Sequence, residues 1–311
     1  MQHLIVGAGP IGTSLALHLA GRGDHIRLVT RSGSGPRHPA VDWVAADAGD
    51  LSALRAALDG VQAVHWCLHA SRYRADVWRA ELPALEERIL RLAAEAAVPV
   101  VFPESLYGLD AGAQPFTAGS PFAPGSIKGQ VRVELLRARA QSPARTVSIP
   151  ASDYFGPFAR ANAHAGERMI VPILRGRTVR PLGSVDQPHS FTYLPDLAAA
   201  MAAAADDPDI EGLVMAPTAP PVTQRELIET YARTAGTPVP PIRPLPSRLL
   251  RWAGRVHRDS GELAEMLHQW ERPYAMDSRD DETRLGLAPT PIEDAAAATI
   301  AWWRETARPR D

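Results

Sequence analysis

The first half of the chain alternates short apolar runs with segments whose apolar residues recur at helical spacing. The runs have the length of buried strands, and the segments between them fit amphipathic helices. Strands that alternate with helices in this way predict a parallel sheet covered by helices on both faces. The runs that predict strands are Leu4–Val6, His25–Thr30, Val41–Ala46, Ala63–Leu68 and Val98–Phe102, and the later helical segments are Leu51–Leu58, Leu82–Ala97 and Lys128–Ala140.

The second half mixes shorter strand patterns with helices and contains no internal repeat. A helix is predicted to begin at Thr223, where Thr223 and Glu226 have the spacing of a capping box. The other predicted elements are strands at Thr146–Ile149, Thr178–Leu182 and Leu213–Ala216, helices at Asp196–Ala205 and Thr223–Ala235, and a basic amphipathic helix at Ser247–Arg258 that follows the proline-rich connector Pro238–Pro246.

We therefore expect an α/β fold, a Rossmann-type doubly wound parallel sheet with a smaller carboxyl-terminal lobe. Residues 1–150 should form the dinucleotide-binding core. Residues 151–311 should form mostly a substrate-binding lobe, with some segments returning to the core.

The motif Gly-x-Gly-x-x-Gly directly follows the first predicted strand and opens a helical pattern. This context is the one that a dinucleotide-binding fingerprint requires. Gly7 permits the tight turn, Gly9 lets the backbone approach a pyrophosphate, and Gly12 lets helix and strand pack closely. Pro10 and Ile11 complete the loop, and the helix N-terminus offers N–H groups to phosphates.

The end of the second strand favours NADP(H) over NAD(H). An NAD-binding protein usually places an acid there for the ribose 2′-hydroxyl, whereas this chain has Thr30, Arg31 and Ser32. A cation between two hydroxyls suits a 2′-phosphate, although a solvated Arg31 is the alternative. Asp47 ends the third strand and suits an adenine amino group. The fourth strand should bring Leu68 and His69 to the cofactor.

Composition narrows the class of protein without identifying a substrate. The formal net charge of −2 gives no electrostatic case for nucleic acid or an anionic membrane. No apolar run approaches the length of a membrane span, and the single cysteine, Cys67, fits a reducing compartment. We expect a cytoplasmic protein. His65, Cys67 and His69 alternate on one strand, but they lack a fourth ligand, so we expect no metal.

Several motifs, in their order, resemble the extended short-chain dehydrogenases/reductases of the epimerase/dehydratase type. The resemblance rests on the glycine fingerprint, Asp47, the loop Ser105–Gly108, the helix headed by Lys128, and the segments Ile149–Pro157, His189–Ala198 and Asp277–Trp303. It implies that Ser105 hydrogen-bonds the substrate and that Lys128 binds the nicotinamide ribose. It also implies a homodimer formed through the helices Leu82–Ala97 and Lys128–Ala140.

One departure from that family concerns the proton donor. The family pairs Tyr-x-x-x-Lys, but the residue four positions before Lys128 is Pro124, which transfers no proton. Tyr107, two residues after Ser105, is a candidate replacement, and its alternative role is packing before a loop glycine. His189, which titrates near neutrality, is a second candidate. Glu104 could act as a base if it is desolvated, but we expect it to be a solvated loop residue.

Further candidates for contact with a small-molecule substrate are Tyr73, Asp153, Tyr154 and His189. Three functions remain open. The first is an NADP(H)-dependent oxidoreductase that acts on a small carbonyl, enone or alcohol. The second is a cofactor-retaining epimerase, dehydratase or isomerase, with Arg160, Arg168, Arg175 and Arg177 available to a sugar-nucleotide diphosphate. The third is a dinucleotide-binding redox sensor without catalysis. The substrate and the reaction direction do not follow from the sequence.

Overall fold

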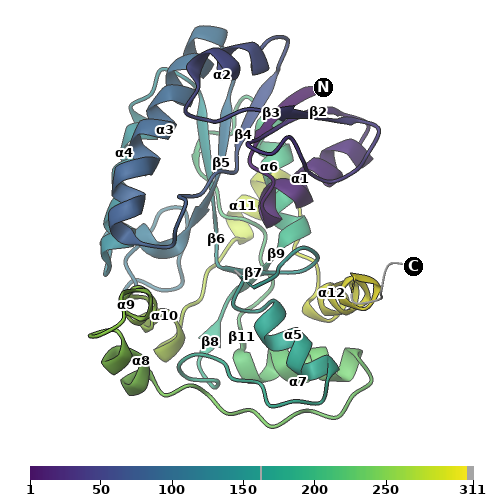
Figure 1. Ribbon diagram of the computed structural model, residues 1–311, viewed down its shortest axis with the longest axis vertical. Helices are drawn as coiled ribbons and strands as arrows, with labels where there is room; N and C mark the ends of the chain where they lie inside the picture. Colours follow the sequence, from purple (N-terminus) through teal and green to yellow (C-terminus); the bar gives the residue numbers. More distant parts are fainter. Residues whose placement is uncertain (162, 307–311) are drawn as a thin grey trace.

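A seven-stranded, wholly parallel sheet forms the centre of the computed structural model, which describes residues 1–161 and 163–306 (Figure 1). The chain order reverses between β1 and β4, as in doubly wound folds, and this confirms the predicted fold class. Across the sheet the strands are β10 (Gly212–Leu213), β6 (Thr146–Ala151), β5 (Val100–Ser105), β4 (Ala63–Trp66), β1 (Gln2–Val6), β2 (His25–Thr30) and β3 (Val41–Ala45).

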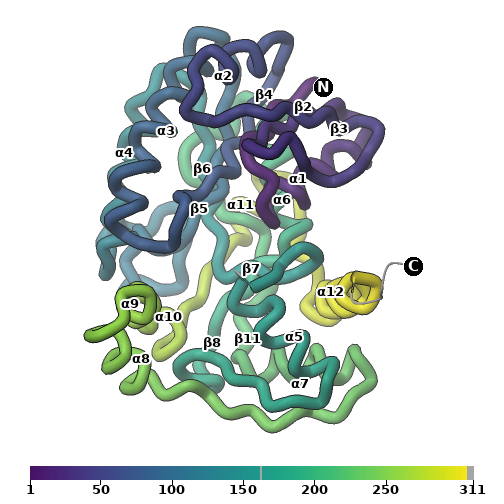
Figure 2. The backbone as a smooth tube through the Cα atoms, viewed as in Figure 1, coloured from purple at the N-terminus to yellow at the C-terminus, as the bar shows by residue number. Residues whose placement is uncertain are grey.

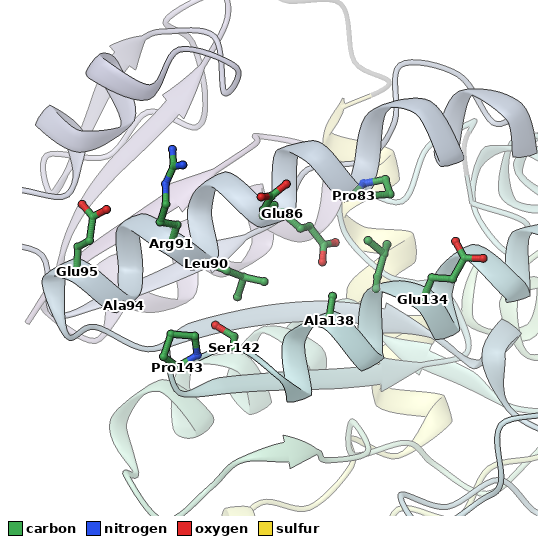
Figure 3. A pocket seen from close by; sticks show the side chains of 12 residues that line it. Pro83, Glu86, Leu90, Arg91, Ala94, Glu95, Glu134, Ala138, Ser142 and Pro143 are labelled. Atoms are coloured by element: carbon green, nitrogen blue, oxygen red, sulfur yellow. The ribbon is translucent and has the colours of Figure 1, made fainter.

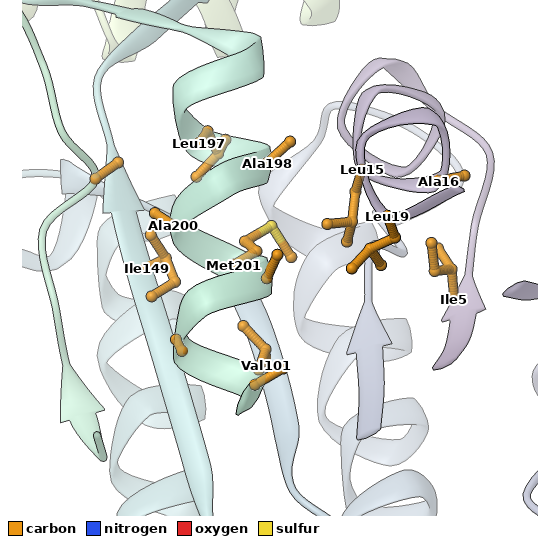
Figure 4. Close-up of a cluster of buried hydrophobic side chains, with 14 of the residues drawn as sticks. Ile5, Leu15, Ala16, Leu19, Val101, Ile149, Leu197, Ala198, Ala200 and Met201 are labelled. Atoms are coloured by element: carbon orange, nitrogen blue, oxygen red, sulfur yellow. The ribbon is translucent and has the colours of Figure 1, made fainter. Parts of the chain in front are cut away.

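Helices cover both faces of this sheet because its strands carry apolar side chains on both sides. One face holds α1 (Pro10–Gly21) and α6 (Leu194–Asp206), which pack Leu15, Leu19 and Met201 against strand residues such as Ile5 (Figure 4). The other face holds α2 (Leu51–Ala57), α3 (Ala75–Ala96) and α4 (Ile127–Ala140).

The second half of the chain contributes to both the core and a smaller lobe. The strand β10 and the helix α6 join the central sheet. The lobe has its own apolar core between α5 (Glu167–Leu174), α7 (Gln224–Thr234) and α12 (Ile292–Thr306), beside two small two-stranded sheets. Their strands are β7 (Asp153–Phe155) with β9 (Phe191–Tyr193), and β8 (Pro188–His189) with β11 (Val222–Thr223).

A group of short helices lies beside the lobe, next to one end of the nucleotide-binding half (Figure 1). Figures 1 and 2 both place α9 (Arg258–Glu265) close to one end of α3 and α4, although these helices are far apart in the sequence. Two carboxylates of α9 confirm this proximity, because they accept hydrogen bonds from the first backbone N–H groups of α3 and α4. The remaining helices are α8 (Ser247–Ala253), α10 (His268–Glu271), α11 (Arg279–Leu285) and the 3₁₀ turn η1 (Leu106–Gly108).

Four element predictions were wrong in their extent. The helix α3 begins at Ala75, seven residues before the predicted start, because Trp78 packs into the interior. The strand β5 continues through Ser105, a stretch predicted as loop. The basic helix predicted at Ser247–Arg258 ends at Ala253 as α8, and a second helix, α9, begins at Arg258. The predicted strand at 178–182 makes only isolated bridges to residues 242 and 245.

The capping box of α7 is present as predicted, with Thr223 and Glu226 bonded to each other's backbone N–H groups. In the described part of the chain no helix combines the length and apolar character needed to cross a bilayer.

Candidate active site

The turn between β1 and α1 has the geometry that its glycines permit. Gly7 has a φ of +104°, a conformation that L side chains rarely adopt. A Cβ atom on Gly12 would lie 2.0 Å from the carbonyl oxygen of Gly7, whereas a Cβ atom on Gly9 would meet nothing within 4 Å. Gly7 and Gly12 therefore make the turn, and Gly9 leaves open space beside the N-terminus of α1.

A cavity of about 1080 Å³ lies in front of this turn, at the carboxyl ends of the strands on either side of the order reversal. In doubly wound sheets, ligands bind in this crevice. The predicted cofactor residues that line the cavity are Gly7, Gly9, Pro10, Ile11, Thr30, Arg31, Ser32, Asp47, Leu68 and His69. Tyr154, predicted as a substrate contact, also lines it, while Gly12 and Lys128 do not.

The end of β2 presents its hydroxyls and one cation to the cavity. Ser32 Oγ lies 2.6 Å from Ser34 Oγ, and Arg31 is exposed. Within the described residues, Arg31 has no ion pair. Asp47 accepts a 2.7 Å hydrogen bond from the backbone N–H of Gly49, which fixes its carboxylate at the cavity wall. Glu81 lines the same cavity, and the charge of Arg31 helps to lower its pKa, after the larger effect of its hydrogen bonds with Ser71.

The strand β5 carries a buried ion cluster, the Arg139 cluster, beneath the predicted substrate loop. Arg139 of α4 donates to both oxygens of Glu86 at 2.7 Å and to Glu104 at 2.9 Å, and also to Ser148 at 3.0 Å. The prediction that Glu104 is solvated is therefore wrong. Arg139 supplies the opposite charge that permits its burial, and it comes from another element, α4.

Ser105 is held by this cluster. Its backbone N–H and its hydroxyl both donate to Glu104 Oε1, at 2.7 and 3.2 Å. The hydroxyl does not line the cofactor cavity. Its predicted role as a substrate contact is untested by this geometry.

Lys128, the only lysine of the chain, is fully buried at the start of α4. Its ammonium donates to the carboxylates of Glu262 and Glu265 on α9 and lies 4.8 Å from the centre of the Tyr73 ring. The same carboxylates accept from the backbone N–H groups of Ala75 and Ile127, at the N-termini of α3 and α4. In this structure the lysine thus binds α9, and its predicted contact with a nicotinamide ribose stays a prediction.

Two phenols connect the cofactor cavity to the lobe. Tyr73 Oη lies 3.2 Å from Tyr107 Oη, and the Tyr73 ring stacks near His69, which lines the cavity. Burial lowers the pKa of His69 to about 4, so this imidazole is neutral at pH 7. Loss of hydration raises the pKa of both phenols above the ordinary value, so both retain their protons. Tyr107 therefore carries the proton that its predicted role as a donor requires.

A second group of polar side chains, the lobe polar cluster, lies between β7, β8 and α10. Its members are Asp153, His164, His189, Gln269, Trp270 and Tyr274. Asp153 Oδ2 accepts a 2.8 Å hydrogen bond from Trp270 Nε1 and lies 3.0 Å from His189 Nε2. Burial raises the pKa of Asp153, but His189, His164 and the Trp270 hydrogen bond together lower it by more, so the net pKa lies below the usual value. The carboxylate is ionised at neutral pH.

His164, which the sequence analysis did not single out, belongs to the same cluster. Its ring lies 4.8 Å from the Trp270 ring, and its Nε2 atom lies 2.6 Å from Gln224 Oε1. Burial lowers the pKa of His164. A histidine in a sequence of small residues gives no signal of its own, because its partners are about 60 and 106 residues further along the chain.

The arginines that could bind a diphosphate lie on the surface. Arg160, Arg168, Arg175 and Arg177 are all exposed, and Arg160 lies over the Trp302 ring at 5.2 Å. None of them lines the cofactor cavity. The structure thus places no arginine of this set inside the site formed by the cavity and the lobe polar cluster.

A separate groove of about 480 Å³ runs between α3 and α4, on the outer side of the sheet (Figure 3). Its floor includes Leu90 and Ala138, and Pro83 and Pro143 lie toward its two ends. The rim carries charges of both signs from Glu87, Arg91, Glu95 and Glu134. These are the two helices through which the resemblance implies a homodimer.

Comparison with known proteins supports the fold and the family. The family model described as "NAD dependent epimerase/dehydratase family" matches residues 3–213. A comparison with curated proteins finds no match.

Solved structures share the fold over nearly the whole chain. A UDP-glucose 4-epimerase from Thermotoga maritima superimposes with a TM-score of 0.78 at 16% identity, covering 99% of this chain and 100% of the other. A UDP-N-acetylglucosamine 4-epimerase from Bacillus cereus gives a TM-score of 0.77 at 14% identity, covering 98% and 96%. A dTDP-glucose 4,6-dehydratase from Streptomyces venezuelae gives a TM-score of 0.77 at 20% identity, covering 98% and 97%.

The structural likeness by itself shows the fold, and the family model adds the class of enzyme, since it spans more than half of the chain. Together with the glycine turn and the cavity at the order reversal, these matches show that the chain belongs to the NAD-dependent epimerase/dehydratase family of short-chain dehydrogenase/reductase-type enzymes.

Proposed function

We propose that this enzyme binds NADP(H) and carries out a redox-neutral epimerase, dehydratase or isomerase reaction through hydride transfer. The observation that carries the proposal is the cavity at the order reversal, which brings the glycine turn, Arg31 and His69 together. A cavity of this size at this place in the fold suits a dinucleotide. Arg31 between Thr30 and Ser32 favours a 2′-phosphate over a free ribose hydroxyl.

The residues of this chain would hold the cofactor along the whole cavity. The N–H groups at the start of α1 would bind the pyrophosphate, Arg31 and Ser32 the 2′-phosphate, and Asp47 the adenine amino group. Leu68 and His69 would border the nicotinamide, which supplies a hydride acceptor or donor when bound. Because His69 is neutral, it would not repel an oxidised nicotinamide ring.

Oxidation of a substrate hydroxyl to a ketone moves a hydride from carbon to the cofactor and a proton from oxygen to a nearby base. Tyr107, hydrogen-bonded to Tyr73, can take that proton and give it back when the ketone is reduced again. This one group suffices for an epimerase, whereas a dehydratase or isomerase needs a second acid or base at the neighbouring carbon. His189, 3.0 Å from Asp153, is the candidate for that second group. The presence of both groups favours the redox-neutral class over a simple reductase.

A net NADP(H)-dependent oxidoreductase that acts on a small carbonyl, enone or alcohol is the second candidate. The basic end of β2 supports it, because NADPH is the usual source of hydride for reductions. Only one proton donor, Tyr107, is needed for that reaction. The redox-sensor hypothesis is less well supported, since a sensor needs no phenol pair beside its cofactor cavity.

The first experiment is a titration of the purified protein with NADPH and NADH, followed by nicotinamide fluorescence. We expect saturable binding with a preference for NADPH of at least about tenfold, the size of one charge-assisted contact. Absence of binding for both nucleotides would refute the proposal. With substrate added, a stoichiometric absorbance change in the nicotinamide band would favour the oxidoreductase, and product without such a change the redox-neutral reaction.

We also propose that the enzyme is a cytoplasmic homodimer assembled through the groove between α3 and α4. Charges of both signs on the groove rim suit a two-fold axis, which places acidic groups of one copy near basic groups of the other. Ala138 is exposed in this groove, so Ala138→Arg should give a folded monomer in sedimentation. A variant that remains a dimer would place the interface elsewhere.

A further inference from the structure

The basic segment that contains α8 has no part in the proposed function, and it exposes large apolar side chains. Leu249, Trp252 and Val256 are 55%, 61% and 77% exposed, and we call these three side chains the α8 patch. Single exposed apolar residues are ordinary, but several gathered on one short segment mark an interaction surface. Figures 1 and 2 place α8 at the outer edge of the molecule, beside α9.

The α8 patch is not needed for the packing of this segment. Leu249 and Trp252 are three residues apart and project from the same side of α8, and Val256 follows four residues later in the turn after the helix. Leu250 projects from another side and packs against the buried cluster that contains Met266. The side of α8 that faces the protein is therefore already occupied, and the patch faces outward.

Two arginines with no acidic partner border the α8 patch. Arg248 and Arg255 lie four residues before and three residues after Trp252, so they neighbour it on the helix surface. Both are exposed, and among the described residues neither guanidinium has an ion pair or a hydrogen bond. Arg251, by contrast, pairs with Glu271 at 2.5 Å. The surface beside the patch therefore carries uncompensated positive charge.

The acidic residues of α9 face the body of the protein and do not neutralise this charge. Two of its carboxylates bind Lys128 and the backbone N–H groups that begin α3 and α4. A third, Asp259, acts on Arg74 in front of α3, whose pKa is raised first by its hydrogen bond to Asp76 and further by the charge of Asp259. Negative charge thus lies on the inner side of this segment and positive charge on the outer side.

We propose that the α8 patch binds the surface of an anionic membrane, with Trp252 among the lipid headgroups and Arg248 and Arg255 on the lipid phosphates. An indole has an apolar body and a polar N–H, which suits the headgroup layer, and an arginine can reach a phosphate while its stem covers apolar surface. Basic residues beside exposed tryptophan and leucine are typical of segments that lie on a membrane. This inference goes beyond the proposed function and stands without it.

The shape of the α8 patch favours a membrane over a protein partner. Its side chains project from the molecule, and they line neither the cofactor cavity nor the groove between α3 and α4. Projecting side chains can insert into a lipid surface, whereas a bound peptide usually needs a groove. The formal net charge of −2 provides no general attraction to anionic lipid, so binding depends on the local charge of this patch.

The first test is co-sedimentation of the full-length protein with lipid vesicles. We expect binding to vesicles of equal parts phosphatidylglycerol and phosphatidylcholine, weaker binding to phosphatidylcholine alone, and release in high salt. Absence of binding to the anionic vesicles would overturn the proposal. Equal binding to both kinds of vesicle would overturn it as well, because the arginines would then have no role.

Variants of the patch identify the surface that binds. Trp252→Ser, and separately the double variant Arg248→Glu/Arg255→Glu, should each weaken binding to anionic vesicles about tenfold or more. The melting temperature should not change, because all three side chains are exposed and substitutions at such positions have little effect on stability. Full binding by both variants would place the membrane contact elsewhere and refute the proposal.

Matched controls come from other parts of the chain. Trp43→Ser removes a tryptophan that is 40% exposed on the edge strand β3. Arg168→Glu/Arg175→Glu reverses two exposed arginines that have the same spacing as Arg248 and Arg255 but belong to the lobe. Both controls should bind vesicles like the wild type. Losses as large as those of the patch variants would show that binding follows overall charge or apolar content and not this patch.

Two further measurements distinguish the membrane from other partners. Tryptophan emission should shift to shorter wavelength with anionic vesicles in the wild type and much less in Trp252→Phe, since the indole leaves water. Polyglutamate that binds as tightly as the vesicles, with no effect of Trp252→Ser, would assign the surface to an acidic protein. Self-association in sedimentation that Trp252→Ser abolishes would assign it to a second copy of this chain. Either result would overturn the proposal.

Discussion

Two buried polar clusters in this enzyme differ in whether the protein satisfies them. In the Arg139 cluster, the guanidinium donates to two carboxylates and a hydroxyl, all within 3.0 Å. In the lobe polar cluster, Asp153 has its partners, but the hydroxyl of Tyr274 has none among the described residues. Both clusters are buried, and both join elements distant in the sequence.

The difference concerns what each cluster contributes to stability. A fully paired buried cluster can fix how α3, α4 and β5 pack, and removal of one member leaves the others uncompensated. An incompletely paired cluster carries a continuing cost in stability. Burial alone does not distinguish the two, and the distinction requires a count of partners.

The largest expected effect is on the paired cluster. Arg139→Leu would leave the carboxylate of Glu86 buried without its cation and Glu104 with Arg132 alone, 3.4 Å away, and should cost about 3–5 kcal/mol of the free energy of unfolding. The measurement is urea denaturation followed by circular dichroism. Arg137→Leu, an exposed position on the same helix, is the control and should change stability by less than about 0.5 kcal/mol. A loss below about 1 kcal/mol for Arg139→Leu would show that the cluster is not structural.

The next effect concerns the phenol that connects the two halves of the site. Tyr107→Phe removes the proposed proton donor and should lower turnover about 10²–10⁴-fold, with NADPH binding intact. Steady-state kinetics on the identified substrate provide the measurement. Tyr231→Phe is the matched control, because this buried tyrosine donates to the Ala165 carbonyl within the lobe core and should affect stability only. A fully active Tyr107→Phe variant would assign Tyr107 to packing and leave His189 as the acid.

A smaller effect is expected at the far end of the cofactor cavity. Arg31→Ala should reduce NADPH affinity by about 1.5–3 kcal/mol, the size of a charge-assisted hydrogen bond, and leave NADH affinity unchanged. Fluorescence titration of both cofactors measures this difference. Arg37→Ala is the control, since Arg37 lines a separate hollow beside Trp43 and not the main cavity. Equal losses for NADPH and NADH would mean that Arg31 reads no 2′-phosphate.

The sequence predicts well those features whose causes lie close together along the chain. The glycine turn, the strand before it and the helix after it depend on neighbouring residues, as does the capping box of α7. The parallel sheet follows from the alternation of strands and helices. Features fixed by distant partners are predicted poorly. The true start of α3 depends on how Trp78 packs against α4, which no local pattern records.

The same limit applies to the site. Most predicted cofactor residues line one cavity, because the carboxyl ends of neighbouring parallel strands meet at one edge of the sheet. The burial of Glu104 depends on Arg139, 35 residues away, and the burial of Lys128 depends on Glu262 and Glu265 of α9. Charged residues are usually solvated, so the sequence favoured an exposed Glu104. Only the fold shows the opposite charges that permit burial.

The smallest expected effect comes from a third buried polar group, the pair His3 and His65, which shows that unpaired buried atoms do not by themselves indicate a ligand. His3 Nδ1 lies 3.1 Å from His65 Nε2, and each ring has one nitrogen without a hydrogen-bond partner. Both rings are fully buried. His3 lies near Asp24 and the chain N-terminus, at the amino ends of the strands and away from the cofactor cavity. We expect this pair to bind no ligand and to act on stability through protons.

Burial lowers the pKa of both imidazoles, and for His3 the charge of Asp24 offsets this in part. Above a pH of about 6.5 the rings are neutral in both the folded and the unfolded chain, so they add no pH dependence. Below that pH the unfolded chain takes up protons that the folded protein does not, and the free energy of unfolding falls by up to about 1.4 kcal/mol per pH unit for each ring.

Urea midpoints at pH 7.5, 6.5 and 5.5 measure this decline. His65→Leu should make it shallower, whereas His25→Leu, at an exposed position, should not. Identical slopes for wild type and His65→Leu would show that the pKa of His65 is the same in the folded and the unfolded chain, and would contradict the lowered pKa expected from its burial.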